Sequence, residues 1–126
     1  MKGSRVRAGF RVALAVLFVA AGVAHFVRTD FYLRIMPPYL PWHRELVLLS
    51  GACEIAGGLG LLVPALRRAA GWGLMALLVA VFPANVHMAV DAWQRDGWTA
   101  WFVVLLLRLP LQFVLLAWTW WVMHDD

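Results

Sequence analysis

Five side chains that can exchange protons or form strong hydrogen bonds lie in or beside long apolar stretches of the sequence: His25, Glu54, Asn85, Arg108 and Gln112. A charged side chain at the centre of a bilayer costs about 2.5–3.5 kcal/mol on insertion scales, so these residues should face protein or water rather than lipid. We expect them to line a polar cavity that opens outward. In it, Arg108 would hold an anionic or carbonyl oxygen, while Glu54 or His25 passes protons. The ligands considered are a quinone head group, a small sulfur compound and protons.

The same residues also fit a structural role. A Glu54–Arg108 ion pair, with Asn85 and Gln112 around it, would fix the packing of the helices, because removing one partner leaves a buried charge uncompensated. His25 taken alone is more often a satisfied buried histidine than a ligand. The sequence leaves both hypotheses open: a binding cavity, or a non-enzymatic scaffold or small-solute or proton permease.

Four apolar spans must position these residues, at about 8–27, 45–66, 69–90 and 100–123. Each is about 20 residues long, enough to cross the hydrocarbon core of a bilayer as a helix. The chain has 126 residues, of which 63% are hydrophobic and 14% charged, too few charges for a soluble surface. We therefore predict an all-α membrane protein, a single domain over 1–126 built as a bundle of four transmembrane helices.

The connections between the spans limit how the helices can be arranged. The loop between the first and second spans is expected to be interfacial and to lie over the site with Pro37, Pro38 and Pro41, while Thr29-Asp30 caps a short helical turn. A very short turn at Arg67-Arg68 makes the second and third spans antiparallel. The second span also has a stripe of small residues that lets another helix approach closely. This stripe consists of Ala52, Ala56 and Gly60.

The depth of each polar residue follows from the rise of about 1.5 Å per helical residue. Counting from the outer surface places His25 and Asn85 within roughly 6 Å, Glu54 and Arg108 at about 12–14 Å, and Gln112 at about 18 Å. Since Glu54 and Arg108 reach nearly the same depth, they are the pair expected to contact each other.

The basic residues predict location and orientation. They lie at the ends of the apolar runs, where topology determinants lie, and form no stripe, so nucleic acid is not an expected partner. Six of them fall on the side of the N-terminus and four on the opposite side, which favours both termini in the cytoplasm. The first group is Lys2, Arg5, Arg7, Arg11, Arg67 and Arg68, and the second is Arg28, Arg34, Arg44 and Arg95. The first span also fits a cleaved secretory signal, but a retained span is preferred because it leads directly into a helical bundle.

Few cofactors fit the sequence. There is no metal-ligand spacing, and the one cysteine, Cys53, allows neither an internal disulfide nor a C-x-x-C pair. Haem held by His25 and His87 is disfavoured, because His87 lies two positions from Asn85 and therefore roughly on the opposite face of its helix. A quinone remains the cofactor considered.

Several short motifs, in this order along the chain, resemble those of the DoxX family of small bacterial membrane proteins. They are His25-Phe26, Pro37-Pro38-Tyr39-Leu40-Pro41, Ser50-Gly51 with Glu54-Ile55 and Gly58, Leu61-Leu62 with Pro64 and Arg67-Arg68, Phe82-Pro83-Ala84-Asn85, and Arg108-Leu109-Pro110 with Gln112.

The resemblance implies a four-helix protein of the bacterial inner membrane with a link to redox chemistry, since related proteins are associated with thiosulfate–quinone oxidoreduction and oxidative-stress complexes. On this basis we expect a membrane subunit of a redox system that meets redox partner proteins. Whether it would be an enzyme or an accessory subunit stays open. The small-residue stripes serve homo-oligomerisation as well as they serve packing within one chain.

Overall fold

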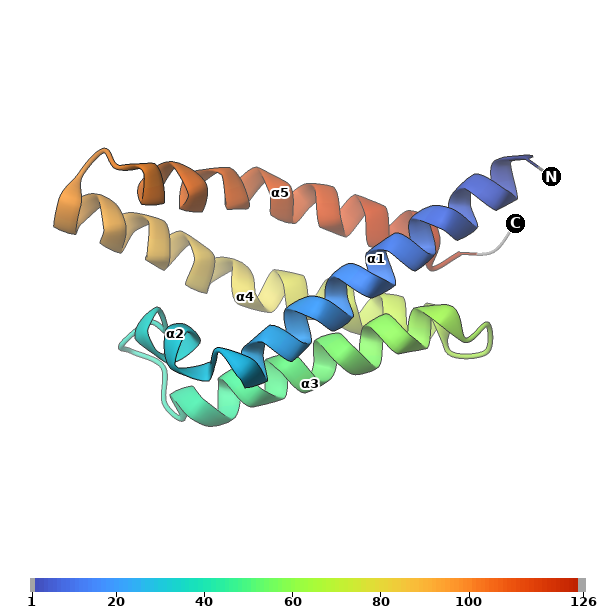
Figure 1. Ribbon diagram of the computed structural model, residues 1–126, viewed down its shortest axis with the longest axis horizontal. Helices are drawn as coiled ribbons and strands as arrows, with labels where there is room; N and C mark the ends of the chain where they lie inside the picture. Colours follow the sequence, from blue (N-terminus) through green and yellow to red (C-terminus); the bar gives the residue numbers. More distant parts are fainter. Residues whose placement is uncertain (1, 125–126) are drawn as a thin grey trace.

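The computed structural model describes residues 2–124, and they form five helices. The four long helices are α1 (Lys2–Val27), α3 (His43–Leu62), α4 (Arg67–Asp96) and α5 (Ala100–Val122), and a short helix α2 (Thr29–Arg34) follows α1. All four long helices are long and apolar enough to cross a membrane, which confirms the predicted all-α membrane fold. The start of α1 and the end of α5 lie at the same end of the bundle (Figure 1). We call this the terminal end.

The helices end where local chemistry interrupts them. Helix α3 stops at Leu62, four residues before the end of the predicted span, because Val63 precedes a proline and takes an extended conformation. Helix α4 continues to Asp96, beyond the predicted end at 90, and Gly97 ends it with a positive φ of 65°. Thr99 caps α5, its hydroxyl oxygen accepting a hydrogen bond from the backbone N–H of Phe102 at 3.0 Å.

Thr29 does not cap the short helix as expected. Arg28 occupies the N-cap position of α2 and makes no side-chain capping bond. The Thr29 hydroxyl instead lies 2.8 Å from the carbonyl oxygen of His25 and 2.9 Å from that of Phe26, so it bonds back to the last turn of α1. This bond ties α2 directly to the end of the first span.

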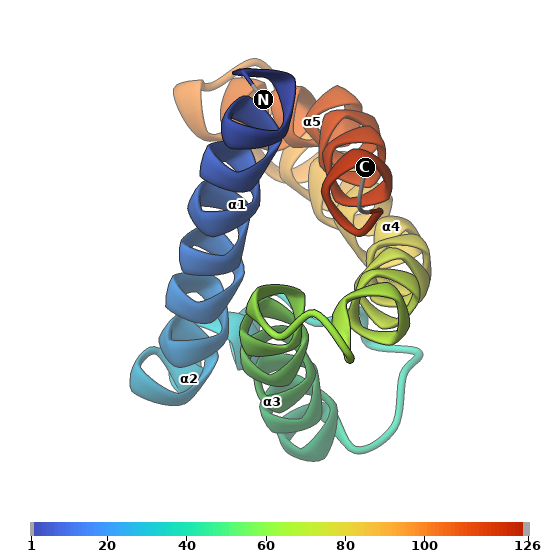
Figure 2. The same ribbon diagram turned by 90° about the vertical axis from the view of Figure 1, so that its right-hand side faces the viewer.

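The helices pack in a row, α1 on α3, α3 on α4 and α4 on α5 (Figures 1 and 2). The row is closed at the terminal end, where α1 meets α5. There the Arg11 Nε donates to the Val122 carbonyl at 2.7 Å, and the Trp118 indole N–H donates to the Phe10 carbonyl at 3.0 Å. Towards the other end α1 and α5 diverge (Figure 1). The apolar core is therefore concentrated near the terminal end, around Leu14, Phe18, Leu61, Leu74 and Val122.

Two glycines bring α1 and α3 into backbone contact. A Cβ atom on Gly22 would lie 2.5 Å from the carbonyl oxygen of Gly51, and one on Gly51 would lie 2.7 Å from the Cβ of His25. The predicted small-residue stripe is wrong in part, because Ala52 and Ala56 are exposed. The crossing at Gly22 and Gly51 places the last turn of α1 against the middle of α3.

Candidate functional site

His25 and Glu54 meet where α1 crosses α3. The His25 Nδ1 lies 3.3 Å from the Glu54 Oε2, and both side chains are mostly buried. The same Nδ1 lies 2.8 Å from the backbone carbonyl oxygen of Ala21. Because a carbonyl oxygen can only accept, Nδ1 carries the proton, and in the neutral ring Nε2 is the free acceptor. The Glu54 Oε2 is buried and accepts no hydrogen bond from any of the described residues 2–124.

Tyr32 covers His25 and was not among the predicted site residues. Its ring stacks on the imidazole with the centroids 4.1 Å apart and the planes 15° apart. Burial raises the pKa of the Tyr32 hydroxyl, the Glu54 carboxylate raises it further, and the Arg108 charge opposes them. The phenol therefore lies within electrostatic range of both charges. No sequence pattern indicates this stacking, since it depends on how the chain turns at Arg28.

Arg108 reaches the same region from α5 without a direct partner. It is half-buried, and within residues 2–124 its side chain makes neither a hydrogen bond nor an ion pair. The expected direct Glu54–Arg108 pair is therefore not formed, and Glu54 lies beside His25 instead. Counting residues from a common surface failed because Glu54 lies on α3 and Arg108 on α5, and these two helices do not pack against each other, so equal depth did not mean contact.

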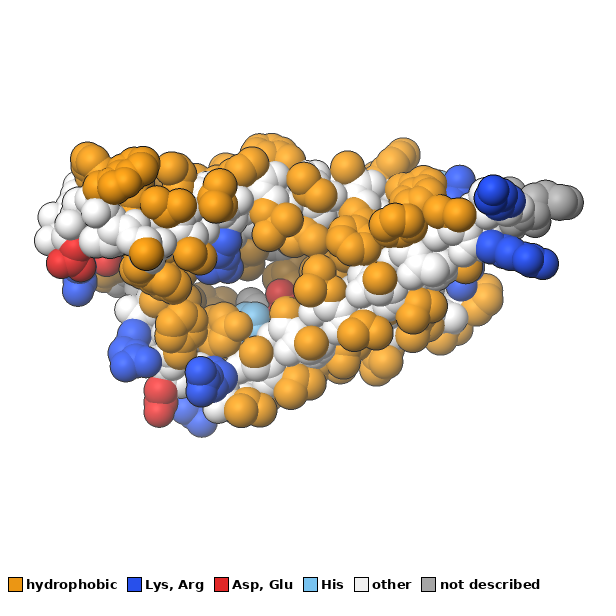
Figure 3. Space-filling model, turned by 45° about the horizontal axis from the view of Figure 1, so that its top comes forward, with side chains coloured by type: hydrophobic (Ala, Val, Ile, Leu, Met, Phe, Trp, Pro, Cys, Tyr) orange, Lys and Arg blue, Asp and Glu red, His pale blue; other side chains and the backbone are white. Residues whose placement is uncertain are grey.

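A hollow lies beside α1 and α5 where these helices diverge. Figure 3 shows it on the side of the bundle, with acidic, histidine and basic side chains visible inside. At the terminal end α1 contacts α5 through the edge-on rings of Phe10 and Trp118, at 5.9 Å between ring centroids. At the other end α2 contacts α5 through Phe31 and Trp101, at 6.2 Å. The hollow opens sideways between two spans, whereas the sequence predicted an outward opening.

Asn85 and Gln112 form a separate, hydrogen-bonded pair between α4 and α5. The Asn85 Nδ2 donates to the Gln112 Oε1 at 2.6 Å, and the Gln112 Nε2 donates to the Leu78 carbonyl at 2.6 Å. Both side chains are buried. Leu78 lies five residues before Pro83 within α4. These two residues join helices α4 and α5.

Gln112→Leu should therefore lower the free energy of unfolding by about 1–3 kcal/mol, because it removes both hydrogen bonds of the pair and leaves the Asn85 amide without its acceptor in an apolar surrounding. The double change Asn85→Leu with Gln112→Leu should recover part of that loss, because it removes both side-chain amides. Unfolding in mixed detergent micelles, followed by circular dichroism, measures both effects. A single variant as stable as the unchanged protein would contradict this structural role.

The predicted loop over the site lies beside it instead. Pro37 is buried and its carbonyl accepts a hydrogen bond from the His43 Nε2 at 3.0 Å, while Pro38 and Pro41 are exposed. Pro38 and His87 line a neighbouring pocket of about 320 Å³ between α2 and α4. Tyr32, rather than the prolines, covers the His25–Glu54 pair because α2 turns back towards α3.

Within the described residues, no group of three or more His, Cys, Asp or Glu side chains could hold a metal ion. Cys53 is free and exposed on α3. The side chains that gather at the hollow are thus a carboxylate, an imidazole, a phenol and a guanidinium.

The fold and this site define a multi-pass membrane protein with polar groups in a hollow beside its helices. The chain belongs to the family described as Domain of unknown function (DUF8561), which matches residues 14–123. No curated protein and no solved structure matches it.

The family match shows that the DoxX resemblance is wrong. The motifs behind it have physical causes that any small four-helix membrane protein shares. Glycines allow helices to approach closely, and prolines and paired arginines mark the ends of spans. The redox association was implied by the resemblance and loses its support with it.

Proposed function

We propose that the protein binds a lipid-soluble small molecule with a polar head group, of the quinone or quinol type, in the hollow beside α1 and α5. The observation that carries the proposal is a pair of incompletely satisfied charged groups. The Glu54 Oε2 is buried without a hydrogen bond, and Arg108 has no partner within residues 2–124. A ligand that both accepts and donates hydrogen bonds would satisfy the two together.

Other buried polar groups of this chain have hydrogen-bond partners within the protein, and this difference from Glu54 and Arg108 supports the proposal. Arg11 and Arg67 donate to backbone carbonyls at 2.7 and 2.8 Å, and Asn85 and Gln112 bond to each other. Where polar residues hold the bundle together, they are matched to partners. The Arg7 Nε is also buried without a hydrogen bond, but its guanidinium donates through Nη1 to the His124 carbonyl. Glu54 and Arg108 depart from the pattern together, which favours a binding role over a scaffold role.

Each residue at the hollow has a role that its geometry allows. Arg108 would donate to a carbonyl or anionic oxygen of the head group. Glu54 and the His25 Nε2 would accept from, or return protons to, a hydroxyl group. Tyr32 would cover the imidazole and exclude water. The sideways opening favours a ligand that arrives through the lipid over a small water-borne sulfur compound, because an apolar tail could stay in the bilayer.

The proposed location is the bacterial inner membrane, with both termini in the cytoplasm. The excess of basic residues at the terminal end supports this orientation. In it, the His25–Glu54 pair belongs to the outer half of the bundle. Redox partner proteins and self-association have no contacts in their favour here, so the proposal is limited to binding.

Titration of the purified, lipid-reconstituted protein with a short-chain quinone analogue tests this proposal. We expect saturable quenching of tryptophan fluorescence, because Trp101 lies at the rim of the hollow in contact with Phe31. Glu54→Gln should weaken binding about tenfold or more, because it removes a charge-assisted hydrogen bond of about 1.5–3 kcal/mol.

The matched control is Glu45→Gln, which makes the same change at an exposed position in the first turn of the same helix. It should bind the analogue like the unchanged protein. Absence of saturable binding, or equal weakening in both variants, would contradict the proposal.

A further inference from the structure

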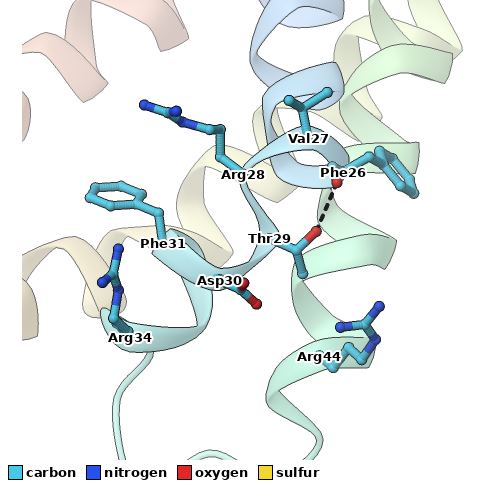
Figure 4. Close-up of a pocket in the computed structure, with 8 residues that line it drawn as sticks. All are labelled: Phe26, Val27, Arg28, Thr29, Asp30, Phe31, Arg34 and Arg44. Carbon is cyan, nitrogen blue, oxygen red and sulfur yellow. Dashed lines mark hydrogen bonds between the residues drawn. The ribbon is translucent and has the colours of Figure 1, made fainter.

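A second pocket, of about 510 Å³, lies at the outer corner of the bundle, at the end opposite the termini. It is formed where α1 ends, α2 turns and α3 begins. Three arginines line it, Arg28, Arg34 and Arg44, together with Asp30 and the exposed ring of Phe31. Figure 4 shows Arg28 and Arg34 extending to the same side as Phe31, with Arg44 across Asp30 on α3. The pocket therefore has an excess of positive charge.

These arginines differ from Arg11 and Arg67 at the terminal end in what their side chains bond. There, Arg11 donates to the Val122 carbonyl and Arg67 to the Leu61 carbonyl, so both close the ends of helices. The side chains of Arg28, Arg34 and Arg44 form no hydrogen bond and no ion pair within residues 2–124. Their donors remain available to an outside group. Three unbonded guanidinium groups around one pocket are not needed for the packing of the helices.

The chemistry of the pocket fits the phosphate of a lipid. A guanidinium presents a planar fork of donors that matches phosphate oxygens in two-point contacts. The pocket lies at the end of the first span, where head groups of the bilayer stand. Phe26 and Val27 of its lining are exposed apolar side chains on α1, placed where an acyl chain would run along the helix.

We infer that this pocket binds the phosphate group of an anionic phospholipid, with its acyl chains against the exposed apolar face at the end of α1. Arg28 and Arg34 would hold the phosphate from one side, and Arg44 would add positive charge from α3. Asp30 disfavours a second negative charge beside it, so a single phosphate fits better than a polyanion. This inference rests on side chains other than those of the quinone-type site, although α1, α2 and α3 contribute to both.

Native mass spectrometry of the full-length protein with defined lipids tests the inference. The unchanged protein should retain phosphatidylglycerol over phosphatidylcholine. The double variant Arg28→Gln with Arg34→Gln should lose about tenfold or more of that preference, because it removes two guanidinium groups that hold the phosphate in two-point contacts. The matched control is Arg5→Gln with Arg68→Gln, two exposed arginines at the terminal end, and it should keep the preference.

Two further measurements distinguish a lost site from a misfolded variant, and a lipid phosphate from free phosphate as the ligand. Arg34→Lys keeps the charge and should keep most of the preference, which guards against a variant that fails only by misfolding. Phosphatidylglycerol, but not inorganic phosphate at equal ionic strength, should protect the pocket arginines from phenylglyoxal. Equal loss of preference in both double variants, no preference in the unchanged protein, or full protection by inorganic phosphate would overturn the inference of a lipid site.

Discussion

Replacing Gly22 by leucine should destabilise the protein by about 3 kcal/mol or more, the largest loss expected from a single change in the bundle. A Cβ atom at this position would lie 2.5 Å from the Gly51 carbonyl oxygen and 2.6 Å from the Ile55 Cγ1. The first of these neighbours is backbone and cannot move without separating the two helices. Unfolding in mixed micelles, followed by circular dichroism, measures the loss.

Gly9→Leu is the matched control. It is the same substitution on the same helix, and a Cβ atom at Gly9 meets nothing within 4 Å. It should change the free energy of unfolding by less than about 0.5 kcal/mol, as surface changes usually do. If Gly22→Leu and Gly9→Leu were equally stable, α1 and α3 would not cross as closely as described.

Any Gly22→Leu protein that stays folded should also lose the candidate site. The crossing at Gly22 and Gly51 is what brings His25 within 3.3 Å of Glu54. The quinone analogue should therefore bind Gly22→Leu more weakly than Gly9→Leu in the same titration. The site thus depends on the absence of side chains at two positions that no ligand would touch.

The four spans were predictable because each is a long apolar run whose length matches the bilayer, and no tertiary contact is needed to see that. The turn at Pro64 and the end of α4 at Gly97 were harder to predict. There the predicted ends of the spans differ from the ends of the helices by several residues. The conformations of Val63 and Gly97 decide those ends, and an apolar window cannot resolve them.

The site was predictable only in part. The sequence marked His25, Glu54 and Arg108 as out of place in apolar runs, and the structure brings the first two into contact. It could not show that Glu54 meets His25 rather than Arg108, because counting residues gives depth along each helix but not which helices are neighbours. Tyr32 was missed for a related reason, since its stacking depends on the turn after α1.

Asn85 and Gln112 were predicted to belong to the site, but in the structure they join two helices instead. Their residue types suggested a site, yet each is satisfied by the other helix. Polar residues within the spans of this chain either hold helices together or are available to a ligand, and the residue type alone does not show which. The two roles differ in whether each polar atom has a partner within the protein. The two arginines within the spans permit a direct test of that distinction.

Arg108→Leu should raise the free energy of unfolding of the ligand-free protein by about 1–3 kcal/mol. Arginine at the centre of a span is disfavoured against leucine by about 3 kcal/mol on insertion scales. Since Arg108 makes no hydrogen bond or ion pair within residues 2–124, the substitution removes that penalty and breaks no bond. The same variant should bind the quinone analogue at least tenfold more weakly, because a guanidinium donor is lost.

Arg11→Leu should have the opposite effect on stability. Arg11 is buried between α1 and α5, and its Nε donates to the Val122 carbonyl at 2.7 Å, so the substitution leaves the end of α5 without a donor. We expect a loss of about 1.5–3 kcal/mol in the same unfolding measurement. A stabilising Arg108→Leu beside a destabilising Arg11→Leu would mean that Arg108 is kept at a cost to the fold, as a ligand-binding residue would be. If Arg108→Leu were destabilising instead, Arg108 would belong with Arg11, Asn85 and Gln112 among the residues that hold the helices together.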